Sequence, residues 1–365
     1  MRRFSVAAQL ALLAAALLLA ACRSDSAAPP SPTSGAAGAP RSFALGLSSL
    51  PAELTDAAYE RAFALAAEAG EVVLIQRTPP WTEMLTGDLS ASTAAATRRE
   101  IDLASQYGLD LFVAIDPTDV AAGRGRLVDL PDDLRGVGFA DPSVRRAFTS
   151  YALYVAENYR PRYLALGVEI NSYQLQRPED FESLLTLYAE TYDAVKERSP
   201  ETLVFPVFQL ERLKGILASD EPYLPQWALF ERFEPRLDLV ALSSYPSLIF
   251  ASPAHIPPSY YAEVLDHTDR PVALAGIGYS SETGPGASAS TEEDQAAFVH
   301  YVLQSAGELE MPLVVWFVGQ DPTFTGTPPF DLLQHIGLVR QDGTEKPAWT
   351  EWEAVARRPY VAAGP

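Results

Sequence analysis

The chain has 365 residues, with 27 basic and 47 acidic side chains, a formal net charge of -20 at pH 7 and one cysteine. A surface this acidic argues against nucleic acid and anionic membranes as partners, because phosphate groups bind basic surfaces. A single cysteine excludes an internal disulfide, so a hydrophobic core must stabilise the fold, and a chain of this length can supply one large domain.

The first 21 residues have the composition of an export signal. Arg2 and Arg3 precede an apolar, alanine-rich stretch from Val6 to Ala21, which is too short for a convincing membrane span. The stretch ends in Leu19-Ala20-Ala21-Cys22, which resembles a bacterial lipobox, and the only cysteine of the chain stands where such a motif is acylated. The resemblance implies a signal peptide over residues 1–21 and a lipid anchor on Cys22.

A tether is expected between this signal and the folded part of the chain. From Arg23 to Arg41 the residues are mostly Ser, Ala, Pro and Gly, too few of them large and apolar to form a core. Arg23 rather than an aspartate follows the cysteine, which by resemblance favours an outer membrane or the cell surface. Loss of the leader, with Arg2 and Arg3, takes the net charge from -20 to -22. The expected organisation is a tether over 22–41, a folded domain over 42–358 and a tail over 359–365.

Short apolar, β-branched runs alternate with longer helical patterns throughout the folded domain. Helix N-caps are expected at Thr55, Asp141 and Thr291, and the last helix is expected over Pro347–Val355. The eight expected strands cover Phe43–Leu47, Val72–Gln76, Leu111–Ile115, Tyr163–Glu169, Leu203–Phe208, Leu237–Ser243, Val272–Ala275 and Leu313–Phe317.

Eight such βα units predict an α/β fold, a single (β/α)8 TIM barrel after the signal and tether. Near-continuous apolar strands are what a parallel sheet covered on both faces requires, and eight strands can close without an exposed edge. The alternative is a doubly wound open sheet, but Gly46-Leu47-Ser48-Ser49 after the first strand is not a glycine-rich phosphate-binding turn. In a barrel, ligands bind at the carboxyl ends of the strands, so the residues after each strand are the functional candidates.

Several motifs lie on or after the later strands and at the end of the domain. They are Gly167-Val168-Glu169-Ile170-Asn171, Leu242-Ser243-Ser244-Tyr245-Pro246, Gly276-Ile277-Gly278-Tyr279, Val315-Trp316-Phe317 and Lys346-Pro347-Ala348-Trp349. Together they resemble the clan A glycoside hydrolases, notably the endo-galactanase-like enzymes, over nearly the whole folded domain.

The resemblance implies a retaining mechanism. In such enzymes an acid after strand four protonates the leaving oxygen, and a carboxylate after strand seven attacks the anomeric carbon. Glu169 matches the acid/base, but Gly276 stands where the family pattern has the nucleophile, and Val168 replaces the asparagine beside the acid. The usual double displacement is therefore not expected, and whether the chain is an enzyme stays open.

Other acids could complete a different mechanism, since inverting hydrolysis tolerates carboxyl groups roughly 6.5 to 9.5 Å apart. Glu282 after strand seven is the substitute candidate, with Asp321 and Asp116 as further loop acids, although each also fits a solvated loop. Alternatively, Glu169 holds a sugar hydroxyl or has a structural role, paired with Arg77 or a backbone amide, because a buried carboxylate needs a partner.

Aromatic and amide side chains after the strands are candidates for sugar binding, because aromatic rings pack on sugar C–H faces and amides bind hydroxyl groups. The alternative is that these side chains pack inside the barrel. The glycine-containing segment Ser281–Ser288 beside Gly276 is a candidate lid. The expected substrate-binding residues are Trp81, Asn171, Tyr173, Gln209, Tyr245, Tyr279 and Trp316, with Gln76 and Gln320 as further polar candidates.

No metal or cofactor is expected. The four histidines lack metal-ligand spacing, and Gly123-Arg124-Gly125-Arg126 lacks the lysine and the strand-to-helix context of a phosphate loop, so it is interpreted as a loop with two cations. The first hypothesis is a monomeric surface lipoprotein whose hydrolase-like barrel acts on or binds a poly- or oligosaccharide. The second is a non-catalytic carbohydrate-binding or scaffold lipoprotein, and the third is a barrel with no role in sugar chemistry.

Overall fold

The computed structural model describes residues 38–217, 223–283 and 290–362. The expected signal peptide, Cys22 and most of the expected tether lie outside the described residues. Within these ranges, no helix has both the length and the apolar character needed to cross a membrane.

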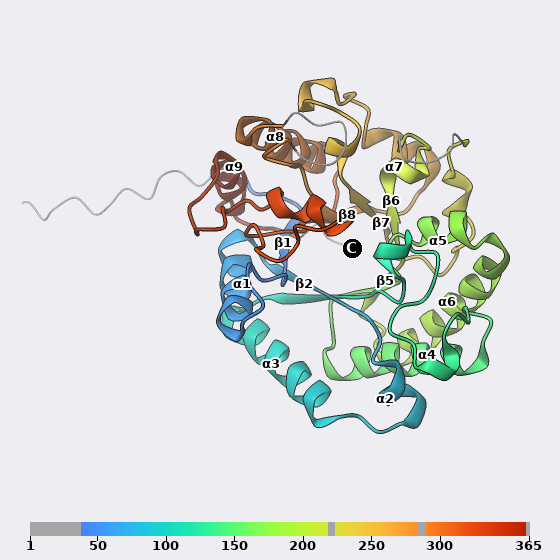
Figure 1. The fold of residues 1–365 in the computed structure, drawn as a ribbon. Helices are drawn as coiled ribbons and strands as arrows, with labels where there is room; N and C mark the ends of the chain where they lie inside the picture. Colours follow the sequence, from blue (N-terminus) through green and yellow to red (C-terminus); the bar gives the residue numbers. More distant parts are fainter. Residues whose placement is uncertain (1–37, 218–222, 284–289, 363–365) are drawn as a thin grey trace, which may run out of the picture. The chain divides into compact units, whose positions relative to one another are not determined.

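The described residues form one sheet of parallel strands with helices around its outside (Figure 1). The strand order is β5-β4-β3-β2-β1-β9-β8-β7-β6. The strands are β1 (Ala44–Ser48), β2 (Val72–Arg77), β3 (Asp110–Ile115), β4 (Tyr163–Leu166), β5 (Leu203–Phe205), β6 (Val207–Gln209), β7 (Val240–Ser244), β8 (Val272–Ile277) and β9 (Leu313–Trp316).

The ring closes through Pro206. Its flanking strands β5 and β6 are the two ends of the sheet order and are consecutive in the chain, separated only by this proline, which has no N–H to donate. Next to it, the N–H of Val207 donates to the carbonyl of Gly167 at 3.0 Å. The expected fifth strand is thus divided in two, and the prediction of a TIM barrel is confirmed.

The helices cover the outside of the sheet, and the expected N-caps are confirmed. The hydroxyl of Thr55 accepts from Ala58, Asp141 accepts from Ser143 and Val144, and Thr291 forms a capping box with Asp294. The helices are α1 (Asp56–Ala69), α2 (Trp81–Thr86), α3 (Ala91–Tyr107), α4 (Pro142–Asn158), α5 (Ile170–Gln176), α6 (Pro178–Arg198), α7 (Leu210–Leu213), α8 (Glu292–Glu308) and α9 (Pro347–Ala356).

The connection from β7 to β8 differs from the regular pattern. It contains only short 3-10 segments, η4 (Pro246–Leu248), η5 (Pro253–His255) and η6 (Ala262–His267), all within the described residues. Prolines at 246, 253, 257 and 258 remove backbone donors and break an α-helix. One of the expected eight helices is therefore replaced by a looped connection whose first part, η4, lies at the carboxyl end of β7.

A small hydrophobic cluster lies apart from the main core. Its buried members are Tyr245, Val318 and Ile336, and partly buried residues of η4 and of the segment η7 (Phe330–His335) pack against them. Both segments follow strands at their carboxyl ends, so this cluster borders the end of the barrel where a ligand site is expected.

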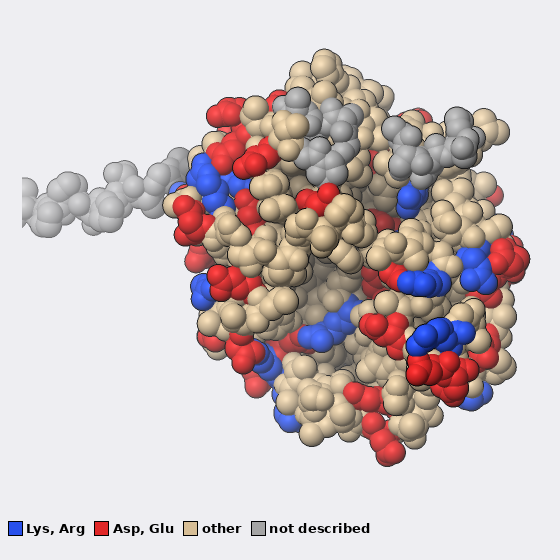
Figure 2. Space-filling model, in the orientation of Figure 1, with Lys and Arg blue, Asp and Glu red and all other residues tan. Residues whose placement is uncertain are grey.

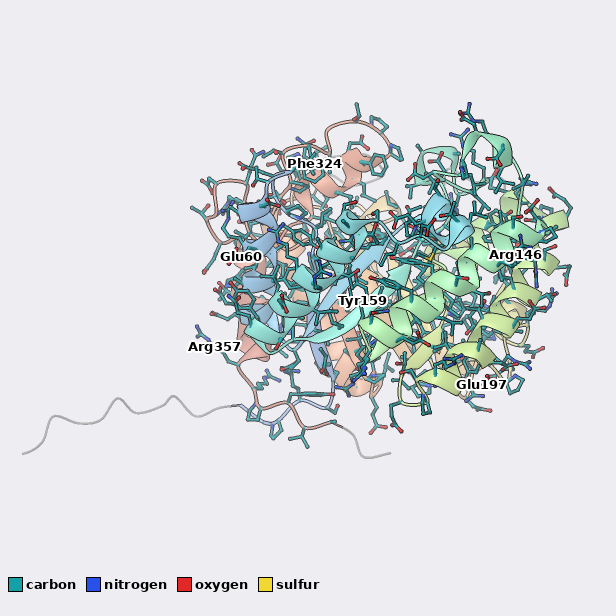
Figure 3. All side chains as sticks on the ribbon, turned by 90° about the horizontal axis from the view of Figure 1, so that it is seen from below. Glu60, Arg146, Tyr159, Glu197, Phe324 and Arg357 are labelled. Carbon is teal, nitrogen blue, oxygen red and sulfur yellow. The ribbon has the colours of Figure 1, made fainter. Side chains whose placement is uncertain are left out.

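The described chain begins and ends at the opposite end of the barrel. Arg41, just before β1, forms a parallel bridge with Tyr360, and its N–H donates to the carbonyl of Pro359 at 3.0 Å. Its guanidinium pairs with Glu71. The side view in Figure 3 places Arg357, at the end of α9, toward this end of the barrel and Phe324, in the loop after β9, at the other.

Candidate functional site

A cavity of about 600 Å³ opens at the carboxyl ends of the strands. Figure 2 shows it as a hollow near the middle of this face. Its volume lies in the range of small-molecule sites. A second groove of about 920 Å³ lies at the amino ends, the end that TIM barrels use for stability, so the first is the candidate site. The polar residues that line the candidate site are Gln76, Arg124, Glu169, Gln209, Arg212 and Ser243.

Two of these residues have an unusual backbone conformation. Glu169, between β4 and α5, has φ 50°, and Arg124, in the loop after β3, has φ 65°. Residues other than glycine rarely adopt positive φ, and such conformations cost on the order of 1–3 kcal/mol unless the surrounding structure holds them. Both side chains meet in the cavity, so the strained backbone places the two partners of one ion pair.

A continuous chain of hydrogen bonds crosses the cavity floor. The Gln76 amide, on β2, donates to Asp116 Oδ2 at 2.8 Å, and Arg124 Nη1 donates to both Asp116 oxygens at 2.8 and 3.0 Å. Arg124 Nε donates to Glu169 Oε2 at 2.8 Å. Ser243 Oγ, on β7, donates to Glu169 Oε1 at 2.9 Å. One guanidinium therefore binds two carboxylates, and the chain of contacts joins opposite sides of the barrel.

This arrangement keeps Glu169 ionised. Burial alone would raise the pKa of Glu169, but the charge of Arg124 and the hydrogen bonds from Arg124 and Ser243 outweigh it, so the pKa lies below its ordinary value of 4.5. Burial opposes the charge of Arg124 as well, yet Asp116 and Glu169 raise its pKa. A carboxyl group that must donate a proton to a leaving oxygen needs the opposite shift.

The cation that pairs with Glu169 is Arg124, and not Arg77. The guanidinium of Arg77, on β2, pairs instead with Glu100 of α3, outside the barrel. Arg124 belongs to the Gly123-Arg124-Gly125-Arg126 loop, and Arg126 of the same loop pairs at the surface with Asp119. Of the two cations in that loop, Arg124 lies in the cavity floor and Arg126 is exposed at the surface.

The end of β8 contributes no functional side chain. Ala275 and Gly276 are consecutive, yet both line the cavity, because β8 carries one extra residue there: Leu242 pairs with Leu274, and Ser243 pairs with Gly276. A Cβ built on Gly276 would meet only Phe317, at an ordinary 3.5 Å. The backbone therefore has room for a side chain at position 276, beside the serine that binds Glu169.

The substitute acids lie elsewhere. Glu282 is exposed and lies 3.6 Å from His335 Nδ1, and it does not line the cavity. Asp321 forms a buried ion pair with Lys346 at 2.6 Å, and burial raises the pKa of Asp321 and lowers that of Lys346. Among the described residues that line the cavity, Glu169 is the only carboxylate.

A further buried glutamate, Glu211, lies behind the cavity wall. Its Oε1 accepts from Ser244 Oγ at 2.7 Å, from the Tyr245 amide at 3.0 Å and from the Tyr260 hydroxyl at 2.8 Å. Burial raises its pKa above 4.5, because these neutral donors compensate the lost hydration only in part. Gln209, which does line the cavity, donates to its other oxygen.

The structure brings four of the expected site residues together. Glu169, Gln209, Tyr245 and the further polar candidate Gln76 all line the cavity. Asn171 does not line the cavity; its side chain joins α5 to the end of β6 through hydrogen bonds with the Gln209 backbone at 2.8 and 3.0 Å. Its amide is therefore used to hold the barrel together.

The other expected aromatic residues are buried outside the cavity lining. Trp81 donates to the Val128 carbonyl and Trp316 to the Ile336 carbonyl. Tyr173 donates to Asp180, and Tyr279 donates to the Phe250 carbonyl while stacking on Phe298. The polar atom of each is satisfied within the protein, as expected for packed aromatic side chains. Most of the expected lid Ser281–Ser288, its residues 284–288, lies outside the described residues.

Sequence reasoning missed Arg124 as part of the site, together with Arg212, Ser243 and the apolar segment Pro328–Leu333. One signal could have identified Arg124: a buried carboxylate after strand four requires a cation, and the loop after strand three lies at the same end of the barrel. In the described part of the chain, no group of three His, Cys, Asp or Glu residues is placed to hold a metal ion.

Comparisons with known proteins support the fold. No family model matches the chain, and no curated protein matches its sequence. Among solved structures, an exo-β-1,4-mannosidase from an Opitutaceae bacterium superposes with a TM-score of 0.67 at 16% identity, covering 87% of this chain and 60% of that one. This chain thus spans well under two thirds of the mannosidase's length.

Two further structures give similar values. A GH5_18 protein from Bifidobacterium longum, solved with Manβ1-4GlcNAc, has a TM-score of 0.63 at 16% identity, covering 88% of this chain and 80% of that one. A family 39 glycoside hydrolase from Bacteroides cellulosilyticus has a TM-score of 0.57 at 17% identity, covering 87% and 64%. At such identities the likeness establishes the fold, a TIM barrel, which these glycoside hydrolases share.

Proposed function

We propose that this barrel binds a short saccharide in the cavity at the carboxyl ends of its strands and does not hydrolyse it by double displacement. The observation that carries the proposal is that Glu169 is the only carboxylate among the described residues that line the cavity. A retaining glycosidase needs two carboxyl groups about 5 Å apart. Position 276, where the resemblance implies the second group, is a glycine.

The state of Glu169 also argues against catalysis. The general acid of a glycosidase must carry a proton at working pH. Arg124 and Ser243 both donate to Glu169 and lower its pKa, so the group is a carboxylate. An ionised carboxylate accepts hydrogen bonds from sugar hydroxyls, which suits binding.

Two observations support a saccharide as the ligand: the solved structures that share this fold, and the side chains that line the cavity. The solved structures with the same fold include a mannosidase and other glycoside hydrolases. The cavity has the volume of a small-molecule site, with an aromatic side chain, Tyr245, and several polar side chains at its surface. The galactanase-like specificity implied by the resemblance is one candidate within this class.

Binding and hydrolysis can be measured on the same samples. The mature chain from residue 22, carrying Cys22→Ser so that it stays unacylated, is titrated calorimetrically with β-1,4-linked disaccharides of mannose, glucose and galactose, and reducing-end release is assayed alongside. We expect binding without release, and weaker binding by Glu169→Gln. Release that disappears in Glu169→Gln would establish a hydrolase instead. No binding by any of the sugars would favour a barrel without a sugar role.

We also propose that the protein is an exported lipoprotein, anchored through Cys22 at an outer membrane or cell surface, and works there as a monomer. The lipobox-like Leu19-Ala20-Ala21-Cys22 supports the anchor. Metabolic labelling with a tagged fatty acid should mark the wild-type chain and leave Cys22→Ser unlabelled. Label on both chains, or on neither, would contradict acylation at Cys22.

A further inference from the structure

We infer that the ligand is a glycan that carries an apolar group on its reducing-end oxygen, an alkyl or aryl glycoside in chemical terms, with the sugar on the polar floor and the apolar group against the loop after β9. This inference rests on the proposed function and specifies the ligand class of the same cavity. It follows from a difference in polarity: one side of the cavity is polar, and the other is apolar.

The polar floor has little hydrogen-bonding capacity left for a long oligosaccharide. The amide nitrogen of Gln209 donates to Glu211, and its carbonyl oxygen accepts from the Arg212 N–H at 2.6 Å. The amide nitrogen of Gln76 donates to Asp116, and Arg124 is shared between two carboxylates. Each sugar residue brings several hydroxyl groups that need partners when buried, so this floor suits one or two rings.

The facing wall is apolar and accessible. It is formed by Pro328, Pro329, Phe330, Leu332 and Leu333, all from the loop after β9. Phe330 is 42% exposed, and both leucines are only partly buried. A free oligosaccharide would leave these side chains in contact with water.

The same apolar lining continues across the mouth. Leu248 of η4 and Leu217 after α7 line the cavity as well, and both are partly buried. Each methylene group that leaves water on such a surface contributes about 0.8 kcal/mol. A ligand with an apolar substituent therefore gains affinity here that an unsubstituted sugar cannot gain.

Matched pairs of ligands test this directly. The mature chain with Cys22→Ser is titrated with the methyl and octyl β-glycosides of glucose, galactose and mannose, each below its critical micelle concentration, and with octyl tetraethylene glycol, which has the chain without the sugar. If three of the seven additional methylenes are buried, the octyl glycoside binds about 60-fold more tightly than the methyl glycoside of the same sugar.

Each outcome decides between the inference and the proposed function. Octyl glycosides that bind more tightly than both the methyl glycosides and octyl tetraethylene glycol support the inference. Equal affinity for methyl and octyl glycosides overturns it and leaves saccharide binding intact. Equal affinity for octyl glycosides and octyl tetraethylene glycol would show that the sugar is not recognised, which contradicts the proposed function. No binding by any probe overturns both proposals.

Two phenylalanines of the same loop provide matched variants. Phe330 lines the cavity, whereas Phe324, 37% exposed, does not. We expect Phe330→Ser to weaken octyl glycoside binding by about fivefold or more, with the methyl glycoside unchanged, and Phe324→Ser to change neither. Equal losses in both variants would contradict contact between the apolar group and this wall.

Discussion

The ends of β4 and β8 lie beside the same cavity and differ in what they carry. Beyond β4, Glu169 is held by Arg124 and Ser243 on a strained backbone. At the end of β8, Ala275 and Gly276 offer no polar side chain, although the backbone has room for one. The difference shows that a carboxylate held by an ion pair and a hydrogen bond within its own protein is a structural element as much as a functional one.

Removing the cation should have the largest effect. Arg124→Leu removes the guanidinium that pairs with both Asp116 and Glu169, and we expect a loss of about 3–5 kcal/mol in the free energy of unfolding. The control is Arg126→Leu in the same loop, whose exposed pair with Asp119 should contribute less than about 1 kcal/mol. Guanidinium chloride unfolding measures both, and equal losses would contradict a structural role for the buried pair.

Adding a carboxylate to β8 should change the chemistry. In Gly276→Glu the new side chain projects into the cavity beside Ser243 and can attack an anomeric carbon. With 4-nitrophenyl β-glycosides of glucose, galactose and mannose, whose leaving group needs little protonation, we expect release at least about 100-fold above the Gly276→Gln control. Mass spectrometry should detect the glycosyl adduct. An inert Gly276→Glu that still binds sugar would exclude position 276 as the nucleophile position.

Glu169 and Glu211 should give opposite pH dependences of stability. The native state holds the proton of Glu169 less tightly than the unfolded chain, because its pKa is lowered, so its stabilising contribution is present above pH 4.5 and is lost as pH falls through the native pKa. The pKa of Glu211 is raised, so its contribution is largest below pH 4.5 and is lost as pH rises through the native pKa.

Urea unfolding between about pH 3 and pH 7 tests both signs, and a difference of one pKa unit corresponds to about 1.4 kcal/mol. Glu169→Gln should reduce the loss of stability on the acid side. Glu211→Gln should reduce the loss that occurs as pH rises above 4.5. The same change of slope in both variants would show that the environments of these two carboxyl groups do not differ as described.

The smallest effect is expected at Ser243, which pairs with Gly276 across β7 and β8. Ser243→Ala removes one hydrogen bond from Glu169 and should cost about 1 kcal/mol and raise the pKa of Glu169. Ser244→Ala, one residue along, removes a hydrogen bond from Glu211 instead and should leave Glu169 unchanged. Carboxyl carbon shifts followed by NMR against pH distinguish the two, and a Glu169 pKa that is the same in Ser243→Ala as in the wild type would contradict this contact.

The fold could be predicted because its signals are local. Apolar runs such as Val72–Gln76, which recur eight times, and caps such as Thr55 report on their own segments. The division of the fifth strand followed from one proline. The connection after β7 could also have been anticipated, since four prolines occur between Pro246 and Pro258.

The site could be predicted only in part because it depends on contacts between distant loops. Glu169 follows a strand, and its place at the mouth comes with the fold. Its partner Arg124 comes from a loop 45 residues earlier, and no spacing marks it. Aromatic residues after strands are ambiguous for a similar reason: Tyr245 and Trp316 follow the same local pattern, but only Tyr245 lines the cavity. Both side chains are buried, and the loops packed around each one decide which of them borders the cavity.

The position of Arg41 has a consequence for how the protein meets its ligand. The chain enters the barrel there, beside Pro359, at the amino ends of the strands. Any attachment through the residues that precede Arg41 therefore joins the barrel at the amino ends of its strands. If the chain is anchored through Cys22 as proposed, the attachment and the cavity lie at opposite ends of the barrel, so that a glycan can reach Glu169 from the end away from the attachment.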